Sequence, residues 1–360
     1  MYLIVTRSFP PEAGGMQNLM WGLTNAISKH YMVKVFADHN DNSKSLDENV
    51  SYSIERIGGP KLIRKYRKAY LINDFIKNNK NIKGVIADHW KSLELIKTNK
   101  KKICLIHSKE INHRKGSLLN KRVLNVLNNI DYVVSNSKFT KNLAINSGVD
   151  VKKIIVINPG VEPSKELSKE ILFEAEDMLQ HKNPRLITVS RLEKRKNHEK
   201  IIMSLRNLKQ LYPNIIYTCI GYGEEEENIK KLVKELNLEN QVLFLKNISQ
   251  ELKNALLAKS NLFVMPSVIY KKSVEGFGIA YIEAAQYGLP SIGGKDGGAS
   301  DAIKNNETGI ICDGNSLDEI YSSIDLILKN NSYKNFINKT KEFAKKFEWD
   351  NIIKQYFKIL

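Results

Sequence analysis

The sequence predicts an α/β protein built from two Rossmann-like, doubly wound domains that face each other across a ligand cleft. Short apolar runs alternate with helix-period segments along both halves of the chain, which is the order of βαβ units on a parallel sheet. At 360 residues the chain is longer than most single hydrophobic cores. The alternation stops in a polar stretch and restarts at Arg185. We therefore expect domains at 1–162 and 185–345, a linker region at 163–184 and a closing segment at 346–360.

The first half contains short β-branched runs, each followed by a turn and a segment with helical spacing. We expect strands at Leu3–Thr6, Val33–Ala37, Ser51–Ile57, Val85–Asp88, Ile103–His107, Tyr132–Ser135 and Ile154–Ile157. The clearest helices are expected at Gln17–Lys29, Ile63–Asn79, Lys121–Asn129 and Lys138–Ser147.

The second half repeats this order of elements. We expect strands at Arg185–Ser190, Ile215–Gly221, Val242–Leu245, Leu262–Met265, Ser291–Gly293 and Gly309–Cys312. Helices are expected at His198–Leu211, Glu225–Leu236, Gln250–Ala258, Ile279–Tyr287 and Leu317–Lys329, and two more close the chain at Tyr333–Phe347 and Asp350–Leu360.

The most informative segment is 275–283, Glu-Gly-Phe-Gly-Ile-Ala-Tyr-Ile-Glu, in which two acids flank a glycine-rich turn. Because a strand precedes the turn and a helix follows it, the turn ends at a helix N-terminus, where backbone N–H groups favour a diphosphate. Glu283 can accept hydrogen bonds from ribose, and Glu275 from hydroxyls of a transferred group. The alternative is a capping acid, two turn glycines and a solvated helix acid.

A second candidate is the basic loop 190–197, Ser-Arg-Leu-Glu-Lys-Arg-Lys-Asn, between a strand and a helix. Arg191 and Lys196 are the expected diphosphate ligands, because one offers a planar fork and the other a point charge. A solvated basic loop is the alternative, and it suits Lys194 and Arg195 best.

Three further junctions lie at expected strand ends. Gly14 and Gly15 occupy a turn where backbone can approach phosphate or sugar, although the turn is not G-x-G-x-x-G and a plain tight turn explains it equally well. Asp296–Gly298 is a similar turn, where backbone must approach something closely or ordinary turn chemistry applies. For His107, a structural and a catalytic role both remain open.

The first half carries most of the positive charge. Residues 1–162 hold 27 of the 56 Lys and Arg but 13 of the 39 Asp and Glu, a balance of +14 within the +17 of the chain. In 61–70 apolar and basic residues recur at helical spacing, and such a helix fits a lipid headgroup surface. A solvated lysine-rich surface is the alternative, and nucleic acid is not expected because no recognition motif is present. The basic residues assigned to the membrane or acceptor are Lys61, Arg64, Lys65, Arg67 and Lys68.

Other classes of protein are disfavoured by what the sequence lacks. No window approaches the length of a membrane span, and the opening apolar run is too short for a signal peptide. Cys104, Cys219 and Cys312 have neither zinc nor disulfide spacing, so a reducing cytosol is the default. The histidines show no metal-ligand spacing, and we expect catalysis without a metal.

With these junctions in place, the chain resembles the family 4 glycosyltransferases of the GT-B fold, and most of all the phosphatidylinositol-mannoside mannosyltransferases. The resemblance covers nearly the whole length. The motifs that carry it are Ser8–Gln17, Ile106–Glu110, Val189–Lys196, Met265–Ser267, Val274–Gly278 with Glu283, and Asp296–Ala299.

The resemblance implies a retaining transfer of a hexose from a nucleotide-diphosphate sugar, GDP-mannose or UDP-glucose, to give an α-glycoside without metal or cofactor. Arg191 and Lys196 would hold the diphosphate and stabilise its charge as it leaves. The leaving phosphate itself would accept the acceptor's proton, so these two cations are catalytic as well. The remaining donor contacts would come from His107, Glu275 and Glu283 and from the backbone of Gly14, Gly15, Gly276, Phe277, Gly278 and Ile279.

The resemblance also assigns the acceptor to the N-terminal domain and returns the closing segment to that domain. The basic balance of that domain favours an anionic lipid or a lipid-linked saccharide, and a cytoplasmic protein held peripherally on the inner face of the cytoplasmic membrane. One departure is Lys109, which stands where those mannosyltransferases have a second histidine. The alternatives are transfer to a soluble acceptor and a non-catalytic nucleotide- or polyanion-binding module.

Overall fold

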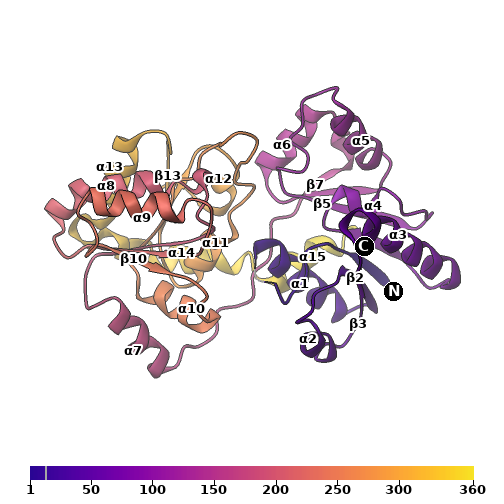
Figure 1. Cartoon of the computed structure of the whole chain (residues 1–360), viewed down its shortest axis with the longest axis horizontal. Coiled ribbons are helices and arrows are strands. Elements are labelled where there is room, and N and C mark those ends of the chain that lie inside the picture. Colours follow the sequence, from indigo (N-terminus) through magenta and orange to yellow (C-terminus); the bar gives the residue numbers. More distant parts are fainter. Residues whose placement is uncertain (13) are drawn as a thin grey trace. The chain divides into compact units, whose positions relative to one another are not determined.

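The computed structural model describes residues 1–12 and 14–360, and Ala13 lies outside these ranges. The chain divides into two compact units, which are coloured along the sequence in Figure 1. Unit 1 consists of Met1–Glu162 and Phe347–Leu360, and unit 2 consists of Pro163–Lys346.

Unit 1 is built on a seven-stranded sheet in the order β3-β2-β1-β4-β5-β6-β7. All neighbouring strands are parallel. The strands are β1 Tyr2–Val5, β2 Val33–Asp38, β3 Ser53–Ile57, β4 Gly84–Ala87, β5 Lys101–Ile106, β6 Tyr132–Ser135 and β7 Ile154–Val156.

The helices of unit 1 cover both faces of its sheet. Helices α3 to α6 pack on one face around Trp90 and Ile72, and α1 and α15 pack on the other around Leu23 and Ile353. The helices are α1 Gly15–Ser28, α2 Lys44–Glu48, α3 Lys61–Asn78, α4 Trp90–Leu93, α5 Leu118–Leu127, α6 Lys138–Ser147 and α15 Trp349–Tyr356, with a 3-10 turn at Val151–Lys153.

The C-terminal helix α15 is fixed to unit 1 by a tryptophan packed against two glycines. A Cβ atom at Gly22 would lie 2.0 Å from the Trp349 ring, and one at Gly160 would lie 2.4 Å from it. The backbone of Val161 also exchanges hydrogen bonds of 2.8 and 3.1 Å with Phe347 and Trp349. These positions therefore require glycine because the indole occupies the space of a side chain.

Unit 2 contains a six-stranded sheet in the order β10-β9-β8-β11-β12-β13, again parallel throughout. Its strands are β8 Arg185–Val189, β9 Ile216–Ile220, β10 Val242–Leu245, β11 Leu262–Met265, β12 Ser291–Gly294 and β13 Gly309–Cys312. The prediction of two parallel-sheet α/β domains is confirmed.

One face of the unit 2 sheet is covered by α8, α9 and α13, which share a core with Val264 and Ile292. The opposite face carries α11, whose Tyr281 ring meets Phe263 at a centroid distance of 5.6 Å. The helices are α7 Lys169–Met178, α8 His198–Leu211, α9 Glu226–Glu235, α10 Gln250–Lys259, α11 Ile279–Gln286, α12 Ala299–Ala302, α13 Leu317–Leu328 and α14 Ile337–Lys345, with 3-10 turns at Lys194–Lys196 and Lys329–Phe336.

The stretch 163–184, expected as a linker region, belongs to unit 2. Its helix α7 is attached to the sheet by Glu176, which accepts hydrogen bonds from Arg185 at the start of β8. These hydrogen bonds, with the charge of Lys259, lower the pKa of Glu176 to about 2 although burial acts in the opposite direction.

Both sheets have a strand at which the order reverses. In unit 1 β1 lies between β2 and β4, and in unit 2 β8 lies between β9 and β11. Ligands of open α/β sheets bind outside the carboxyl ends of such strands. The loops after β1 and β8 are therefore the first places to look for a site.

Candidate functional site

The loop after β8, residues 190–197, is tied to two other loops of unit 2. It ends at Asn197, which takes a left-handed conformation with φ 66° immediately before α8. Its side-chain amide donates to the carbonyls of Pro266, at 2.9 Å, and Gly314, at 2.7 Å. Because these carbonyls follow β11 and β13, one side chain joins the carboxyl ends of three strands.

Two buried cations of this loop converge on one carboxylate. Lys196 and Arg195 both donate to Oε2 of Glu275, Arg195 at a distance of 2.8 Å. Lys196 is 8% exposed and Glu275 9%. Burial alone would raise the pKa of Glu275, but the charges of Lys196 and Arg195 outweigh it and lower this pKa to about 2. Burial lowers the pKa of Lys196, and the charge of Arg195 lowers it further, although Glu275 and Glu193 act in the opposite direction.

A second acid extends this cluster toward the surface. Glu193 accepts hydrogen bonds from Arg195 at 2.9 Å and forms an ion pair with Arg191 at 2.7 Å. The Arg191 side chain is 67% exposed, whereas that of Arg195 is 12% exposed. Three cations thus meet two carboxylates within this cluster, and such a local excess favours an anionic ligand. Lys194 of the same loop pairs instead with Glu199 and Glu225.

The loop from Glu275 to Gly278 ends at the N-terminus of α11 and rests on a glycine turn. Gly278 is left-handed, with φ 90°. The Gly298 N–H donates to the Glu275 carbonyl at 2.8 Å, and a Cβ at Gly298 would lie 1.9 Å from the Gly276 carbonyl oxygen. The turn Asp296–Gly298 was expected to approach something closely, and the structure shows that it approaches the backbone of the Glu275 loop.

The second acid of the motif, Glu283, lies on α11 and is also paired. It accepts a hydrogen bond of 2.9 Å from Lys253 on α10, and the two side chains are 23% and 11% exposed. Glu283 is thus a partly buried ion-pair member rather than a solvated helix acid. Its contact with ribose remains a prediction, as do the donor contacts of the buried Phe277 and of Ile279.

A buried hydrogen-bond chain runs beneath the basic loop. The His198 ring lies 3.0 Å from the Ser190 hydroxyl through Nε2 and 2.8 Å from the Tyr217 hydroxyl through Nδ1. The Tyr217 oxygen is 2.8 Å from that of Thr188, which donates to the Val264 carbonyl. The backbone pairing of β8 with β11 consists of Leu186 with Leu262 and Ile187 with Phe263. The hydrogen bond from the Thr188 hydroxyl to the Val264 carbonyl continues the contact between these strands past the end of that pairing.

The hydrogens of this chain can be assigned by counting. A carbonyl only accepts, so Thr188 donates to Val264, Tyr217 to Thr188, His198 Nδ1–H to Tyr217, and Ser190 to His198 Nε2. Burial and the charge of Lys196 lower the pKa of His198 to about 3, so the ring is neutral at pH 7. His198 therefore carries its hydrogen on Nδ1.

Unit 1 contains the other predicted donor contacts. Gly14 and Gly15 lie at the start of α1. His107 follows β5, and its backbone N–H donates to Glu110. The Nε2 atom of His107 is buried and has no hydrogen-bond partner among the described residues. The ring borders a small cavity lined also by Leu19 of α1 and Tyr356 of α15. A role for these residues in binding a sugar stays a prediction.

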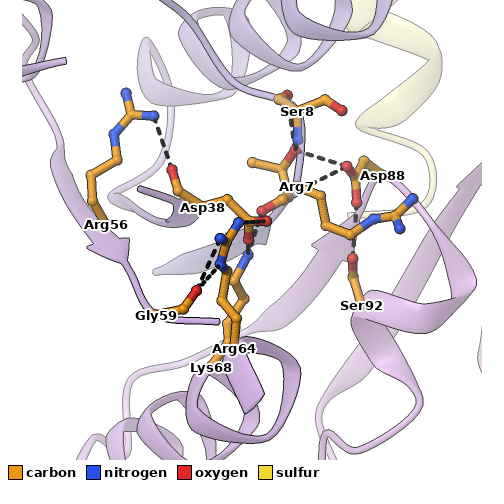
Figure 2. Close-up of polar contacts among 10 residues, drawn as sticks. Arg7, Ser8, Asp38, Arg56, Gly59, Arg64, Lys68, Asp88 and Ser92 are labelled. Atoms are coloured by element: carbon orange, nitrogen blue, oxygen red, sulfur yellow. Dashed lines mark hydrogen bonds and ion pairs between the residues drawn. The ribbon is translucent and has the colours of Figure 1, made fainter. Parts of the chain in front are cut away.

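The basic residues of α3 are mostly turned toward the protein, as Figure 2 shows for Arg64 and Lys68. Lys68 is 6% exposed and pairs with Asp38, which also accepts a 3.0 Å hydrogen bond from Arg64. Lys65 pairs with Glu94, which follows α4. Carboxylates of unit 1 thus already pair with these three cations, and their contact with a membrane surface stays a prediction.

The outward face of α3 is apolar instead. Among the basic residues assigned to the membrane, Arg67 is exposed, and the side chain of Lys61 lies outside the described part of the structure. The exposed apolar side chains are Leu62 at 86%, Ile63 at 60%, Tyr66 at 63% and Tyr70 at 71%. From Leu62 to Tyr70 this helix thus presents tyrosines and aliphatic groups to solvent, with the exposed Arg67 among them.

Arg195 is the residue for which the sequence offers no role. A solvated loop was the alternative that suited it, but the structure buries it against Glu193 and Glu275. Asn197 is the residue from which a turn at this place could have been predicted, because Asn tolerates a left-handed backbone. The structure shows this turn immediately before α8. Within the described residues no group of three potential metal ligands occurs, and no described helix is long and apolar enough to cross a bilayer.

Two family models match successive parts of the chain. The model described as Glycosyltransferase Family 4 matches residues 13–165, and the model described as Glycosyl transferases group 1 matches residues 172–345. The chain is also 22% identical over 344 residues to the GDP-mannose-dependent alpha-(1-6)-phosphatidylinositol monomannoside mannosyltransferase of Mycolicibacterium smegmatis, which covers 89% of this chain and 87% of that protein.

Solved structures share the architecture of the whole chain. The Anabaena protein HepE in complex with UDP has a TM-score of 0.82 at 18% identity and covers 99% of this chain and 98% of its own. Sucrose-phosphate synthase from Thermosynechococcus elongatus has a TM-score of 0.81 at 20% identity, with coverages of 99% and 97%. At these identities the likeness shows a common fold.

Proposed function

Since the chain belongs to the GT-B glycosyltransferases, with a family 4 domain followed by a group 1 domain, we propose that it is a retaining, metal-independent hexosyltransferase. The donor is a nucleotide-diphosphate sugar, GDP-mannose or UDP-glucose. The acceptor is an anionic lipid or a lipid-linked saccharide, and the product is an α-glycoside. The enzyme acts in the cytoplasm, peripherally on the inner face of the cytoplasmic membrane. The relatives support both donors, since one is named as GDP-mannose-dependent and HepE has been solved with UDP-glucose.

The observation that carries this proposal is the buried cluster around Glu275. Lys196 and Arg195 share its Oε2 atom, and together with Arg191 they set three cations against the two carboxylates of Glu275 and Glu193, so the cluster carries one more positive than negative charge. The same loop continues from Glu275 into the N-terminus of α11, whose first amides have no acceptor within the helix. A diphosphate would neutralise the charge and accept from the amides together.

Each charged group has a distinct task in this scheme. Lys196 and the exposed Arg191 bind the diphosphate, and Arg195 keeps Glu275 ionised beside it. Glu275 then directs a carboxylate oxygen to the hydroxyls of the hexose, since only its Oε2 atom is engaged by the two cations. Glu283 binds the ribose, with Lys253 holding its position.

The transfer itself breaks the bond between the sugar C1 and the diphosphate oxygen, and the electron pair leaves with the diphosphate. The acceptor oxygen bonds to C1 on the face that the diphosphate leaves, and its proton passes to a diphosphate oxygen. Lys196 and Arg191 stabilise the negative charge that grows on the leaving group, which is the largest electrostatic demand of the reaction.

Donor hydrolysis tests the proposal without knowledge of the acceptor. We expect slow release of hexose from GDP-mannose or UDP-glucose, and a loss of roughly 10²- to 10³-fold in rate for Lys196→Ala, as for removal of other transition-state donors. Arg206→Ala is the matched control, because Arg206 is an exposed cation on α8. The proposal fails if no nucleotide sugar is turned over with any acceptor, or if the Lys196 variant matches the control.

The acceptor class is tested by supplying the same donor with two kinds of acceptor. Vesicles of anionic phospholipid and soluble sugars are offered in parallel, and labelled hexose is followed into the lipid phase. Transfer to soluble sugars alone would replace the lipid acceptor with a soluble one. Tight nucleotide binding without turnover would indicate a non-catalytic binding module.

A further inference from the structure

Unit 1 gathers cations at the carboxyl ends of two neighbouring strands. Strands β1 and β4 are paired up to Val5 and Ala87. Arg7 follows β1, and its backbone N–H donates to Asp88 at 2.9 Å. Lys91 lies in α4, just after β4. Register and hydrogen bonding thus place Arg7 and α4 side by side at the strand where the sheet order reverses.

A buried indole brings a third cation to the same place. Trp90 is 0% exposed, and both Lys91 Nζ, at 5.2 Å, and Arg122 Cζ, at 5.5 Å, lie over its ring. Arg122 also forms two hydrogen bonds of 2.9 Å with Glu94, which Lys65 shares. The cluster therefore spans the loop after β1 and the helices α3, α4 and α5.

The carboxylates nearby are already occupied. Burial tends to raise the pKa of Glu94, but hydrogen bonds from Arg122 and Lys65 outweigh it and lower this pKa, so Glu94 is fully committed to those two cations. Asp88 accepts from the Thr6 hydroxyl, the Arg7 N–H and the Ser92 hydroxyl.

Arg7 and Lys91 are left without an ion pair among the described residues. Figure 2 shows the Arg7 side chain extending away from Asp38, Arg64 and Lys68. Burial lowers the pKa of Lys91, and the charges of Arg7, Arg122 and Lys65 lower it further. An anion placed between Arg7 and Lys91 would relieve this repulsion.

We propose that Arg7 and Lys91 form an anion site that binds the phosphate of the acceptor. The inference rests on the proposed function and deepens it, because it names a charged group of the acceptor and the residues that hold it. A guanidinium fork next to an ammonium suits a phosphate, which offers several oxygens in different directions.

The surroundings of the site favour a phosphate that is attached to an apolar molecule. The ring centroid of Tyr66 on α3 lies 5.8 Å from Nζ of Lys65, which shares Glu94 with Arg122. Tyr66, Leu62 and Leu118 are exposed by 63%, 86% and 81%. An amphiphilic phosphate ester would place its phosphate between the cations and its apolar part against these side chains.

The test is phosphate binding by the whole protein, measured with glycerol 3-phosphate while a saturating nucleoside diphosphate occupies the cations of unit 2. The variants are Arg7→Gln and Lys91→Gln. The control is Lys152→Gln, an exposed cation before β7 at the opposite ends of the strands. We expect each variant to weaken binding by at least about tenfold and the control to stay within about twofold of wild type.

A second arm distinguishes the source of the phosphate. Sedimentation with vesicles of phosphatidylcholine alone, and of phosphatidylcholine with phosphatidylglycerol, is compared for the same proteins. Binding of glycerol 3-phosphate that is lost in the variants supports the site, and so does loss of anionic-vesicle binding alone, which assigns the site to a lipid headgroup. Variants that bind both probes like wild type, or a wild type that binds neither, overturn the proposal.

These readouts separate the site from the transferase assignment. Donor hydrolysis by the wild-type protein tests unit 2 in the same preparation. If hydrolysis fails while phosphate binding depends on Arg7 and Lys91, the proposed function falls and the anion site stands. If hydrolysis succeeds while the variants bind phosphate normally, the site falls and the transferase stands.

Discussion

Lys196 donates to the same carboxylate oxygen of Glu275 that accepts from Arg195, and both members of the Lys196–Glu275 pair are more than nine-tenths buried. A shared acceptor oxygen leaves the ammonium poorly neutralised, which supports the proposed role of Lys196 as a diphosphate ligand. Under that proposal, the pair would link the stability of unit 2 to the binding of the donor.

Glu275→Gln removes the acid that Lys196 and Arg195 share, which leaves Lys196 buried without its ion-pair partner while Arg195 keeps Glu193. Breaking one side of a buried ion pair costs about 3–5 kcal/mol, so we expect a loss of this order in the free energy of unfolding, measured with urea. Glu283→Gln is the control, because the Glu283 side chain is 23% exposed and pairs with one cation. Equal losses for the two variants would contradict a special role for Glu275.

The pH dependence of stability provides a second test of the same carboxylate. The pKa of Glu275 falls from 4.5 to about 2 on folding, so its contribution is complete above about pH 5 and is lost as the pH falls toward 2. Linkage gives a loss of about 2 kcal/mol between pH 7 and pH 3. We expect the difference in unfolding free energy between wild type and Glu275→Gln to shrink by this amount over that range. A constant difference would show that Glu275 is not ionised with a lowered pKa.

Tyr217→Phe removes the acceptor of the His198 Nδ1–H. The His198 ring recovers a hydrogen bond if its hydrogen moves to Nε2, because Nε2–H can then donate to the Ser190 hydroxyl. The Ser190 hydroxyl in turn donates to the Arg191 carbonyl, 3.2 Å away. The Cys219 thiol lies 3.9 Å from the His198 Nδ1 atom and then donates a hydrogen bond to it. We expect the side-chain nitrogen shifts of His198 to report a change of tautomer, and KM for the donor to rise more than kcat falls.

Tyr281→Phe is the matched control for this experiment. It removes a buried hydroxyl that donates to the Met265 carbonyl and does not contact His198. Both variants lose a buried hydrogen bond, so a similar loss of stability is expected. A tautomer change in both, or in neither, would contradict the assigned direction of the chain.

The positions of the strands along the chain could be predicted from the sequence, because apolar runs and turns are local features. The candidate loops were also found at the right junctions, since strand ends of parallel sheets collect ligand-binding residues. The Glu275 loop and the basic loop indeed meet, through Lys196.

Partners far along the chain could not be predicted. Helical spacing placed Arg64, Lys65 and Lys68 on a basic face, but it could not show that Asp38 and Glu94 lie opposite them. Whether a cation faces solvent or a carboxylate depends on how the helix is rotated on its sheet, and spacing alone does not fix that rotation. The proposed anion site could not be predicted for the same reason, since the pairing of β1 with β4 is what places Arg7 next to α4.

Gly22→Ala tests the attachment of α15 to unit 1. Alanine favours helices over glycine by about 1 kcal/mol, but its Cβ would lie 2.0 Å from the Trp349 ring. Overpacking of this kind costs about 1–3 kcal/mol, so we expect a net loss of stability on urea unfolding. The control is Gly58→Ala, where the nearest atom to the added Cβ is 3.6 Å away. A double change of Gly22→Ala with Trp349→Leu should cost less than the sum of the single changes, and strict additivity would contradict the contact.

The exposed face of α3 predicts which of its residues would contact the membrane under the proposed function. Leu62 and Tyr66 are 86% and 63% exposed, whereas Lys68 is buried in an ion pair with Asp38. Full burial of a large apolar side chain contributes about 1.5–3 kcal/mol, and partial insertion of two such groups gives a comparable total. We therefore expect Leu62→Ser with Tyr66→Ser to lower partitioning to anionic vesicles by roughly tenfold or more at unchanged stability, and Lys68→Met to lower stability with little effect on partitioning.

The control for this comparison is Val151→Ser, an aliphatic side chain that is 52% exposed and lies before β7. Its removal should leave vesicle binding unchanged, because it lies at the opposite ends of the strands from α3's first turn. If Val151→Ser reduces partitioning as much as the α3 variant does, the loss reflects general surface hydrophobicity. If Lys68→Met abolishes partitioning while the protein remains folded, the basic face of α3 rather than its apolar face is in contact with the lipid.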